Sequence, residues 1–408
     1  MKILFLCVGM AFEVNEKTSR NATGYSYLVR DLASEMIKKN NVAIDCYSKN
    51  KEPEKDSWRG INLVKRTFLR ILRYARPYYL IKGIEFARLI DGAGFWKTLY
   101  LIFTFLEGGL VEAIIKEGKY DLVSIQGFTE HSIPYILACQ RTGCRYCVSF
   151  HALNIFHKNL YTNQERVTKW ALDQLAKDRV PVSFISSRMR DRALRAIEPQ
   201  NKEKANFITI LNGCTSIPEV PGDVRKILNI PDSANLGICC GNITELKNQV
   251  QVVRAYNLLD PKLKKDLYFI FVGNINDMNI RAEIEKSDHP SHLILCGPID
   301  HEQLFPYYNA SDFVCIPSIS EGFGLSAIEG FSLGKPVLMW SDLDAVEDIY
   351  DENAMNLVKE RDDVSFSKGI EKMIQINWDS KYIEDISKKY SISRMTSDYL
   401  RWFEEQLA

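Results

Sequence analysis

Short apolar runs alternate with amphipathic segments along most of the chain. In the first half the apolar runs include KILFLCVG, VAIDCYS, DLVSIQGF and RYCVSFH, and segments with helical spacing such as GYSYLVRDLASEMIKK separate them. In the second half LGICCGNIT, LYFIFVGN, DFVCIPS and KPVLMW alternate with segments such as QVQVVRAYNLL. Continuous apolar strands that alternate with amphipathic helices are typical of a parallel sheet covered on both faces. The pattern therefore predicts an α/β fold with two doubly wound, Rossmann-like domains.

The alternation breaks between residues 212 and 235, where NGCTSIPEVPGD and NIPDSAN are rich in Pro, Gly, Asn and Asp. A chain of 408 residues is long for one hydrophobic core and suits two domains. We therefore expect an N-terminal domain over residues 1–215 and a C-terminal domain over 216–390. Ligands of such sheets bind beyond the carboxyl ends of the strands, so a cleft between two facing domains is the expected site.

Residues 58–110 do not follow the alternation, because they are apolar, basic and rich in aromatic side chains. The basic residues of this segment are Arg59, Lys65, Arg66, Arg70, Arg73, Arg76, Lys82, Arg88 and Lys97. The composition fits an interfacial amphipathic helix pair that contacts anionic lipid. It fits equally well a helical cover over the sheet with a solvated basic face. No recognised motif accompanies the charge, so we expect no nucleic-acid partner.

The bulk composition is that of a soluble globular protein, with 46% hydrophobic and 25% charged residues and a net charge of zero. The ten cysteines lie mostly in apolar runs, as free thiols of a reducing cytosol do. Cys144 and Cys147 lie three apart in a strand-like run and should point to opposite faces, so we expect no shared metal. The N-terminal run suits a buried strand better than a signal peptide, and we expect no membrane span. A cytoplasmic location follows as an expectation.

Two carboxylates bracket a glycine turn in SEGFGLSAIEG, residues 320–330. The preceding DFVCIPS is a buried strand, and LSAIEGFSLG is a helix that ends at Gly334. The free N–H groups at the start of this helix suit a phosphate, and glycines let the backbone approach it closely. Glu321 and Glu329 would repel a phosphate, but a carboxylate can accept hydrogen bonds from vicinal hydroxyls. A phosphate with hydroxyl-bearing groups on both sides describes a sugar nucleotide.

This stretch resembles the signature of family 4 glycosyltransferases, also called group 1, which have the GT-B fold. The signature is Glu, seven residues and Glu, with Gly-Phe-Gly after the first, and the resemblance covers almost the whole chain. GNITELKNQ is similar to the family's phosphate-binding segment, SFHALN to its strand-end histidine, and ATGYSYLVRDLA to its N-terminal glycine loop. The last segment, 391–408, resembles the closing helix that packs back on the N-terminal domain.

The resemblance implies a role for each matching residue. Glu329 would bind the ribose hydroxyls of the donor, and Glu321 would hold the transferred sugar and its phosphate together with the backbone of Gly322, Phe323, Gly324 and Leu325. Lys247 would neutralise the diphosphate leaving group. His151 would contact the donor sugar near the reacting carbon, and Gly24 would let the first loop approach the diphosphate. Enzymes of this family retain the anomeric configuration and need no metal, so no metal or other cofactor is expected.

Two positions depart from the family pattern. Gly241-Asn242 stands where the family usually has Gly-Arg, so one cation on the diphosphate is missing. Asn242 can donate a hydrogen bond but carries no charge. Either another residue supplies the charge, for instance Arg188 or Arg190, or the leaving group is stabilised less. Thr23-Gly24 stands where a glycine pair is common.

Each of these residues also has a purely structural interpretation. Lys247 alone would be a solvated lysine at a helix start, and His151 could be a hydrogen-bonded histidine at a strand end. Glu321 and Glu329 alone could be surface acids. The joint order of the motifs favours the functional interpretation.

The sequence therefore predicts a retaining glycosyltransferase that moves a sugar from a nucleotide-diphosphate sugar to a glycan or a lipid-linked oligosaccharide. Residues 58–110 suggest a peripheral contact with the anionic cytoplasmic membrane face, in polysaccharide or lipopolysaccharide synthesis. Two alternatives stay open. One is a nucleotide-sugar epimerase, and the other is a non-catalytic GT-B protein that binds a glycan or a partner.

Overall fold

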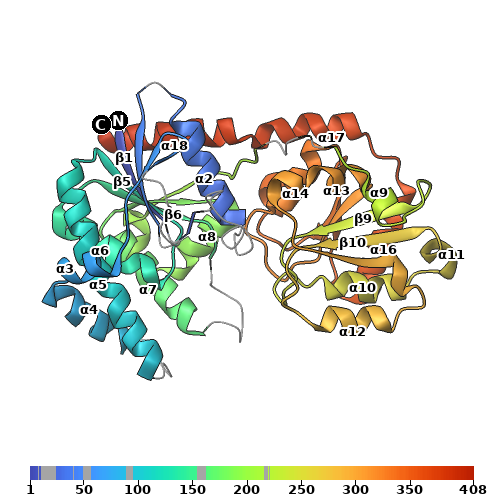
Figure 1. The fold of residues 1–408 in the computed structure, drawn as a ribbon, viewed down its shortest axis with the longest axis horizontal. Coiled ribbons are helices and arrows are strands. Elements are labelled where there is room, and N and C mark those ends of the chain that lie inside the picture. The colour runs from blue at the N-terminus through green and yellow to red at the C-terminus, as the bar shows by residue number, and fades with distance from the viewer. Residues whose placement is uncertain are drawn as a thin grey trace. The chain divides into compact units, whose positions relative to one another are not determined.

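The computed structural model describes residues 1–7, 9–10, 24–39, 41–48, 57–88, 95–153, 162–215, 219 and 221–408, without the side chains of residues 97, 162–164 and 302. The chain forms two compact units (Figure 1). Unit 1 comprises Met1–Leu211 and Met395–Ala408, and unit 2 comprises Asn212–Arg394. Thr23 and most of the expected N-terminal glycine loop lie outside the described residues.

Unit 1 is built on an eight-stranded sheet in the order β3-β4-β2-β1-β5-β6-β7-β8. All neighbouring strands are parallel except β3 and β4, which form an antiparallel edge. The strands are β1 (Lys2–Cys7), β2 (Ala43–Ser48), β3 (Ser57–Trp58), β4 (Ile61–Leu63), β5 (Leu122–Gln126), β6 (Tyr146–Phe150), β7 (Pro181–Phe184) and β8 (Asn206–Thr209). Residues 3–7 of β1 are fully buried, as expected of a central strand covered on both faces.

Helices cover both faces of this sheet. They are α2 (Gly24–Met36), α3 (Phe68–Arg73), α4 (Pro77–Ala87), α5 (Phe95–Gly118), α6 (Ile133–Thr142), α7 (Thr162–Lys177) and α8 (Ser187–Ala196), with short 3₁₀ turns η1 (Glu130–Ser132) and η2 (Pro199–Lys204). The chain returns to unit 1 at its end through α18 (Ile392–Leu407), in the segment expected to close the fold. Tyr399, Trp402 and Phe403 of α18 are buried, and the Tyr399 hydroxyl lies 3.5 Å from the Ser183 hydroxyl of β7.

Unit 2 is built on a six-stranded, all-parallel sheet in the order β11-β10-β9-β12-β13-β14. The strands are β9 (Asn235–Cys240), β10 (Leu267–Val272), β11 (Leu293–Gly297), β12 (Phe313–Ile316), β13 (Val337–Trp340) and β14 (Met355–Val358). The predicted α/β fold with two parallel sheets is therefore confirmed. The hydrophobic pattern did not predict β14, β3 or β4, which are short and lie at a sheet edge or next to one.

Most helices of unit 2 connect successive strands, while α9 precedes β9 and α16 and α17 follow β14 (Figure 1). The helices of unit 2 are α9 (Val224–Ile227), α10 (Val250–Asn257), α11 (Pro261–Lys264), α12 (Asn279–Glu285), α13 (Phe305–Ala310), α14 (Leu325–Ser332), α15 (Val346–Ile349), α16 (Asp363–Gln375) and α17 (Ser380–Ser387), with 3₁₀ turns η3 (Pro290–His292), η4 (His301–Gln303) and η5 (Lys388–Tyr390). The short helix α9 lies inside 212–235, which the sequence analysis interpreted as a linker. Asp223 caps it by accepting a hydrogen bond from the Lys226 backbone N–H at 3.1 Å.

Residues 58–110 differ in part from both interpretations of the segment. The described part begins with the edge strands β3 and β4, and only then continues as α3, α4 and α5. Thr98–Gly118 of α5 is long and apolar enough to cross a membrane by length and composition, contrary to the expectation that no segment reaches that length. Two thirds of its most apolar window is buried within the protein, as in the core helix of a soluble domain.

Candidate active site at the switch point of unit 2

The predicted donor-binding residues of unit 2 gather where its strand order reverses. From β9 the chain proceeds outward through β10 to β11, and then returns to β12 on the other side of β9. β9 and β12 are neighbours, with Gly237 paired to Phe313 and Ile238 to Val314. Crevices beyond the carboxyl ends of two such strands are the usual ligand sites of open α/β sheets. Lys247 follows β9, and Glu321 follows β12.

Lys247 and Glu321 form an ion pair across this switch point. The Lys247 Nζ lies 2.5 Å from the Glu321 Oε2, and the Ser318 hydroxyl donates to the same oxygen at 3.4 Å. The other carboxylate oxygen accepts from the Gly324 backbone N–H at 3.3 Å. The Glu321 side chain is 13% exposed and that of Lys247 34% exposed. The carboxylate is therefore held by its own turn, while its cation remains accessible from solvent.

The turn between β12 and α14 has the geometry that its glycines predict. Gly324 caps α14 in the left-handed region, with φ 75° and ψ 56°, where a residue with a Cβ atom would be strained. Phe323 is 2% exposed and its ring packs against Tyr390, with centroids 6.1 Å apart. Gly330 lets α14 lie close to β12, since a Cβ there would come within 2.6 Å of Val314 Cγ2. The backbone of Gly322–Leu325 is therefore fixed at the start of the helix.

Asn242 is tied into the neighbouring loop through one end of its amide. Its Oδ1 accepts from the Asn274 backbone N–H at 3.2 Å and from the Asn274 side-chain amide at 3.1 Å. Gln249 donates to the Asn242 carbonyl oxygen at 3.2 Å and to that of Gly241 at 3.3 Å. The Asn242 amide therefore connects the loops after β9 and β10, and its NH₂ group is the end left to act as a donor.

Glu329 lies on the first turns of α14 and is 8% exposed. The Tyr308 hydroxyl donates to its Oε2 at 2.6 Å, and the His301 Nε2 donates to its Oε1 at 3.1 Å. Burial disfavours the charged form of Glu329. The hydrogen bond and charge of His301, the hydrogen bond of Tyr308 and the charge of Lys247 outweigh burial and hold the pKa of the carboxyl below its usual value. Glu329 is thus a buried carboxylate that stays ionised near neutral pH.

A small hollow lies beside the Lys247–Glu321 ion pair. Its lining includes Lys247, Gln249, Ser318, Glu321 and Ser326, together with backbone and cysteine atoms at the ends of β9 and β12. The Ser326 hydroxyl donates to the Cys240 carbonyl oxygen at 3.4 Å, which ties the first turn of α14 to β9. Within the described ranges, no three His, Cys, Asp or Glu side chains are grouped as a metal site requires. The hollow offers a cation, hydroxyls and an anchored carboxylate to a ligand.

In unit 1 the strand order reverses between β1 and β5, and His151 follows β6, the next strand beyond β5. Gly24 is the first residue of α2, and the next residue, Tyr25, packs its ring 5.0 Å from that of His151. The Tyr25 hydroxyl donates to the Gln126 carbonyl oxygen at 2.5 Å, and His151 Nε2 donates to the Gln126 Oε1 at 2.9 Å. The structural interpretation of His151 as a hydrogen-bonded strand-end residue therefore has direct support.

His151 also has a feature that a structural role leaves unexplained. Its Nδ1 is buried and has no hydrogen-bond partner among the described residues. Burial lowers the pKa of His151 to about 3, so the ring is neutral and Nδ1 carries a lone pair. A buried unpaired acceptor is costly and suggests a missing donor. The hydroxyl of a ligand would satisfy it.

The other cations considered for the diphosphate, Arg188 and Arg190, lie on α8 of unit 1. Arg190 donates to its neighbour Asp191 at 2.8 Å and 3.1 Å. A role of these arginines toward a ligand of unit 2 stays a prediction.

Sequence reasoning did not find Tyr308, His301 or Gln126. Tyr308 and His301 lie 21 and 28 residues before Glu329, on α13 and η4, so no local motif connects them to it. The run LFPYYNA reads as an ordinary apolar helix. Only the packing of α13 beside α14 shows that one of its tyrosines holds the glutamate.

Comparison with known proteins supports the class of glycosyltransferases that the sequence predicts. Residues 222–390 match the family model described as Glycosyl transferases group 1. A D-inositol 3-phosphate glycosyltransferase of Streptosporangium roseum is 24% identical over 249 residues, which cover 57% of each chain, so this chain spans little more than half the length of that curated relative. The identity is too low and the coverage too partial to transfer its substrate.

Solved structures match over the whole chain. A sucrose-phosphate synthase from Thermosynechococcus elongatus has a TM-score of 0.73 at 16% identity and covers 99% of both chains. The Anabaena protein HepE, solved in complex with UDP-glucose, has a TM-score of 0.71 at 14% identity and covers 99% of this chain and 100% of its own. At this identity the matches establish the fold alone.

The fold and the site therefore define a two-unit nucleotide-sugar-binding architecture of the GT-B type. The C-terminal part of the chain, residues 222–390, matches the glycosyl transferases group 1 family, glycosyltransferase family 4. The family resemblance stated from the sequence is confirmed.

Proposed function

We propose that the protein is a retaining glycosyltransferase that takes a sugar from a UDP-sugar and transfers it to a hydroxyl of a glycan or a lipid-linked oligosaccharide. The observation that carries this proposal is the arrangement at the β9–β12 switch point. There the solvent-accessible Lys247 pairs with Glu321 in the turn before α14, and the ionised Glu329 lies on α14 itself. HepE, which shares the fold, is solved with UDP-glucose, and this favours UDP among the possible nucleotides.

The ion pair suits a diphosphate leaving group. Lys247 is a third exposed, so a bound diphosphate can take the place of Glu321 as its partner. Glu321 would remain in place, because Ser318 and Gly324 hold both of its oxygens. A cation held near the breaking bond stabilises the negative charge that develops on the leaving phosphate. Asn242 would add a neutral hydrogen bond from its NH₂ group.

Glu329 suits the vicinal hydroxyls of a ribose. An ionised carboxylate has about four acceptor positions, and His301 and Tyr308 fill one on each oxygen. Two positions are left, one on each oxygen, which is the number a cis-diol requires. The depressed pKa of Glu329 keeps it an acceptor at neutral pH.

The family resemblance implies that His151 contacts the donor sugar near the reacting carbon and that Gly24 lets the first loop approach the diphosphate and the acceptor, and the proposal keeps these roles. The proton of the attacking hydroxyl would pass to the donor phosphate. The setting in polysaccharide or lipopolysaccharide synthesis, and a cytoplasmic location, remain part of the proposal.

The test begins with nucleotide binding. UDP, GDP, ADP and CMP are titrated against the wild type and against Glu329→Gln, and the melting temperature is followed. A ligand at a hundred times its dissociation constant stabilises the native state by about 2.7 kcal/mol. We expect UDP to raise the melting temperature of the wild type and to lose this effect in Glu329→Gln. The matched control is Glu384→Gln, an exposed glutamate of α17, which should respond like the wild type.

Activity then separates the alternatives. UDP-sugars are incubated with and without a glycan acceptor, and the products are resolved by chromatography. Release of UDP together with a glycosylated acceptor supports the transferase. A changed sugar on an intact nucleotide would instead show an epimerase. If no nucleotide shifts the melting temperature and no donor is turned over, the protein is a non-catalytic binding protein.

A further inference from the structure

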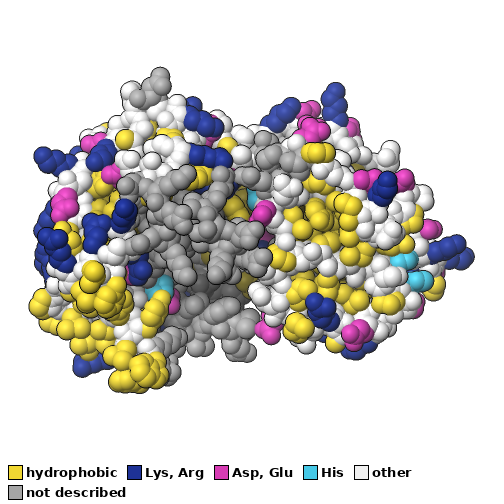
Figure 2. Space-filling view, in the orientation of Figure 1, with side chains coloured by type: hydrophobic (Ala, Val, Ile, Leu, Met, Phe, Trp, Pro, Cys, Tyr) yellow, Lys and Arg dark blue, Asp and Glu magenta, His cyan; other side chains and the backbone are white. Residues whose placement is uncertain are grey.

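Unit 1 exposes an unusual number of large apolar side chains on three consecutive helices. Of the eighteen large hydrophobic side chains that are exposed in the described part of the chain, ten lie between residues 68 and 100. They are Phe68, Leu69, Leu72, Leu80, Ile81, Ile84, Phe95, Trp96, Leu99 and Tyr100, which we call the α3–α5 face. Figure 2 shows them as yellow side chains at the lower left, over α3, α4 and the start of α5. Scattered surface apolar residues are ordinary, but a gathered set marks an interaction site.

These helices are apolar on two sides. On α4, Tyr79, Gly83 and Phe86 are buried, while Leu80, Ile81 and Ile84 form a second apolar stripe that is exposed. Residues three and four apart share one side of a helix, so the exposed stripe is continuous along α4. A helix of a soluble domain normally presents polar residues on the side away from the core.

The start of α5 extends this face. Phe95, Trp96, Leu99 and Tyr100 repeat at helical spacing and are 42% to 80% exposed, with Trp96 the most exposed of the four. Phe68 of α3 stacks on Phe103 of α5 with ring centroids 5.4 Å apart, so the apolar side chains of α3 and α5 are in contact. Exposed tryptophan, phenylalanine and tyrosine beside leucine and isoleucine are typical of side chains that enter the interfacial zone of a bilayer.

Two of the basic residues of this segment are paired within the protein and are not available to contact a lipid surface. Arg66 bonds both its Nε and a terminal nitrogen to Glu107, and Arg76 bonds Glu112 at 2.7 Å. Both carboxylates are 1% exposed. These two arginines therefore hold the helices to the core rather than meet a ligand.

Other basic residues lie at the margin of the α3–α5 face. Lys65, Arg73 and Arg88 are exposed, and Figure 2 shows Lys and Arg side chains beside the yellow area. Of the seven basic residues between 64 and 88, Arg66 and Arg76 bond buried carboxylates, and Lys82 pairs at 2.7 Å with Glu85, the one acid of this stretch. Lys65, Arg70, Arg73 and Arg88 therefore supply the charge of this margin. The margin is thus positively charged.

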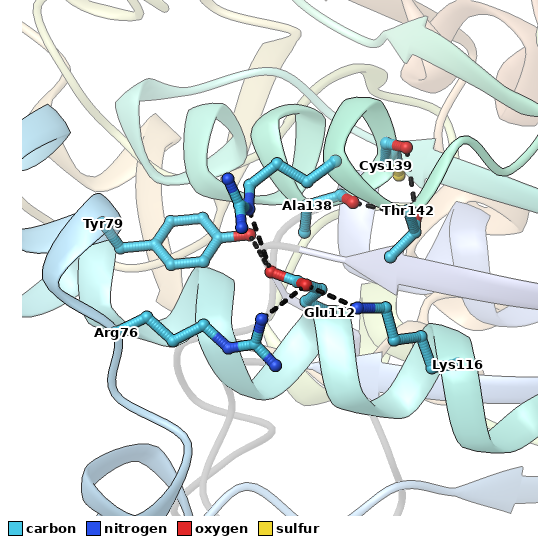
Figure 3. A network of polar contacts seen from close by, with 8 residues as sticks. Arg76, Tyr79, Glu112, Lys116, Ala138, Cys139 and Thr142 are labelled. Atoms are coloured by element: carbon cyan, nitrogen blue, oxygen red, sulfur yellow. Dashed lines mark hydrogen bonds and ion pairs between the residues drawn. The ribbon is translucent and has the colours of Figure 1, made fainter.

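The face is held rigidly from beneath. Around Glu112, Figure 3 shows Arg76, the N-cap residue of α4, Tyr79 of α4 and Lys116 of α5 converging on one carboxylate. Arg141 of α6 adds a fourth donor at 3.2 Å. This network joins α4 to α5 and α6, so the exposed stripe of α4 is presented in a fixed orientation. A surface that is already ordered loses little conformational entropy on binding.

We propose that the α3–α5 face docks the protein on an anionic lipid bilayer, with its aromatic and aliphatic side chains in the interfacial zone and Lys65, Arg73 and Arg88 against the lipid headgroups. Charge decides between lipid and a second copy of this chain. A self-complementary contact would bring one basic margin against another, which is unfavourable. An anionic bilayer offers both an apolar interior and negative charge. This inference does not depend on the proposed catalytic activity.

The experiment is vesicle flotation of the full chain. The probes are vesicles of phosphatidylcholine alone and vesicles of phosphatidylcholine mixed with phosphatidylglycerol. We expect the wild type to float with the mixed vesicles and much less with phosphatidylcholine. Size-exclusion chromatography with light scattering is run in parallel on the same samples to record the oligomeric state.

Two pairs of variants separate the apolar contribution from the charge. Leu69→Glu with Trp96→Glu should lower the partition coefficient at least about tenfold, since each removes a large side chain from the bilayer interface and adds a charge. Its matched control is Ile227→Glu with Met278→Glu, two equally exposed apolar residues of unit 2. Arg73→Gln with Arg88→Gln should lower it about thirtyfold on mixed vesicles only, because each basic residue near an anionic surface contributes about 1 kcal/mol. Its control is Lys262→Gln with Arg281→Gln, which are also exposed and lie in unit 2.

Since all eight positions are exposed, each variant should fold, and its melting temperature should match that of the wild type. Flotation that is lost in the α3–α5 variants and kept in both controls supports the proposal. Flotation of Leu69→Glu with Trp96→Glu at the wild-type level overturns it. Absence of flotation of the wild type also overturns it. A wild-type dimer that becomes monomeric in Leu69→Glu with Trp96→Glu, without flotation, would assign the face to self-association instead.

Discussion

Two pairs of glutamates with little or no exposure, one pair in each unit, differ in how many of their carboxylate acceptor positions are filled. On α5 of unit 1, Glu107 and Glu112 are each 1% exposed. In unit 2, Glu321 and Glu329 are 13% and 11% exposed at the side chain. All four meet the same kinds of donor, namely cationic side chains together with tyrosine, serine or backbone groups.

The α5 carboxylates are saturated. Glu112 accepts from Arg76 and Lys116 on Oε1 and from Tyr79 and Arg141 on Oε2, which fills about four acceptor positions. Glu107 is filled in the same way by two nitrogens of Arg66 and by the hydroxyls of Tyr47 and Tyr135. No acceptor position is left for a ligand, so we assign both residues to the stability of unit 1.

The unit 2 carboxylates are not saturated. Among the residues that the structure describes, Glu329 has two donors, and Glu321 has three, one of which is the accessible Lys247. Burial and an ion pair alone therefore do not identify a functional carboxylate. The number of unfilled acceptor positions, at the carboxyl ends of strands, separates the two pairs.

The largest expected effect is on stability, in Glu112→Gln. Removing the charge leaves three cations around a neutral amide, and breaking a buried ion pair in this way costs about 3–5 kcal/mol. Equilibrium urea unfolding at pH 7 should show this loss, while Glu117→Gln, an exposed glutamate on the same helix, should stay near the wild type. A loss below about 1 kcal/mol would mean that a buried carboxylate with all its acceptor positions filled need not stabilise the fold.

The same network predicts a pH dependence. Burial raises the pKa of Glu112, but the hydrogen bonds of Lys116 and Arg141, the charge of Arg76 and the hydrogen bond of Tyr79 outweigh it and leave the pKa below its usual value. A depressed carboxyl pKa stabilises the fold above the unfolded pKa, and this stabilisation is lost as the pH falls through the folded pKa. In Glu112→Gln this acid-dependent part of the stability should be absent.

The next effect is on activity, in Lys247→Met and Glu321→Gln. Loss of one group that stabilises developing charge typically lowers kcat by about 10²–10³-fold. We expect such a fall in UDP-sugar transfer in Lys247→Met, and a fall in Glu321→Gln because this carboxylate would hold the transferred sugar. The melting temperature should not change, since Lys247 is partly exposed and Glu321 keeps its backbone contact. Lys262→Met on α11 is the control. Wild-type turnover in both variants would remove this ion pair from the site.

The variant His151→Gln extends the comparison to another residue of unit 1, because the Nδ1 of His151 is also a buried acceptor without a donor among the described residues. Burial holds its folded pKa at about 3, so between pH 6.5 and 5 the unfolded chain binds a proton that the folded chain does not. Stability should therefore fall by up to about 2 kcal/mol over this range in the wild type and less in the variant. Urea midpoints at both pH values measure the difference. Equal slopes would show that the ring is protonated in the folded state.

The sequence predicted the parts of the molecule that depend on local pattern. Apolar strands, amphipathic helices and the glycine turn at Gly324 follow from side-chain periodicity and from backbone geometry that glycine alone adopts easily. The edge strands β3 and β4 were missed because they have two and three residues, too few to show alternation. The helix α9 was missed because Pro, Gly and Asp surround it.

Contacts between distant segments could not be predicted in the same way. Nothing in the sequence pairs Arg66 with Glu107, 41 residues later, or His301 with Glu329, 28 residues later. From the sequence, Arg66 and Arg76 were predicted to belong to a lipid-facing or solvated basic surface, whereas the fold pairs them with the buried Glu107 and Glu112. Tertiary packing alone decides which charges are free to meet a ligand, and this is where sequence reasoning failed.

The smallest expected effect is that of Tyr308→Phe, which tests whether the donors of Glu329 position it for a ribose. The Tyr308 hydroxyl donates at 2.6 Å to one carboxylate oxygen, and its loss frees an acceptor position without removing a charge. A hydrogen bond to a charged group contributes about 1.5–3 kcal/mol, so UDP affinity should fall about tenfold if the bond fixes the carboxylate. KM for the donor should rise, while kcat changes little, because ribose is remote from the breaking bond. Tyr307→Phe, the neighbouring tyrosine on the same helix, serves as the control. If Tyr308→Phe instead binds UDP more tightly, Tyr308 competes with the ribose for Glu329 rather than orienting it.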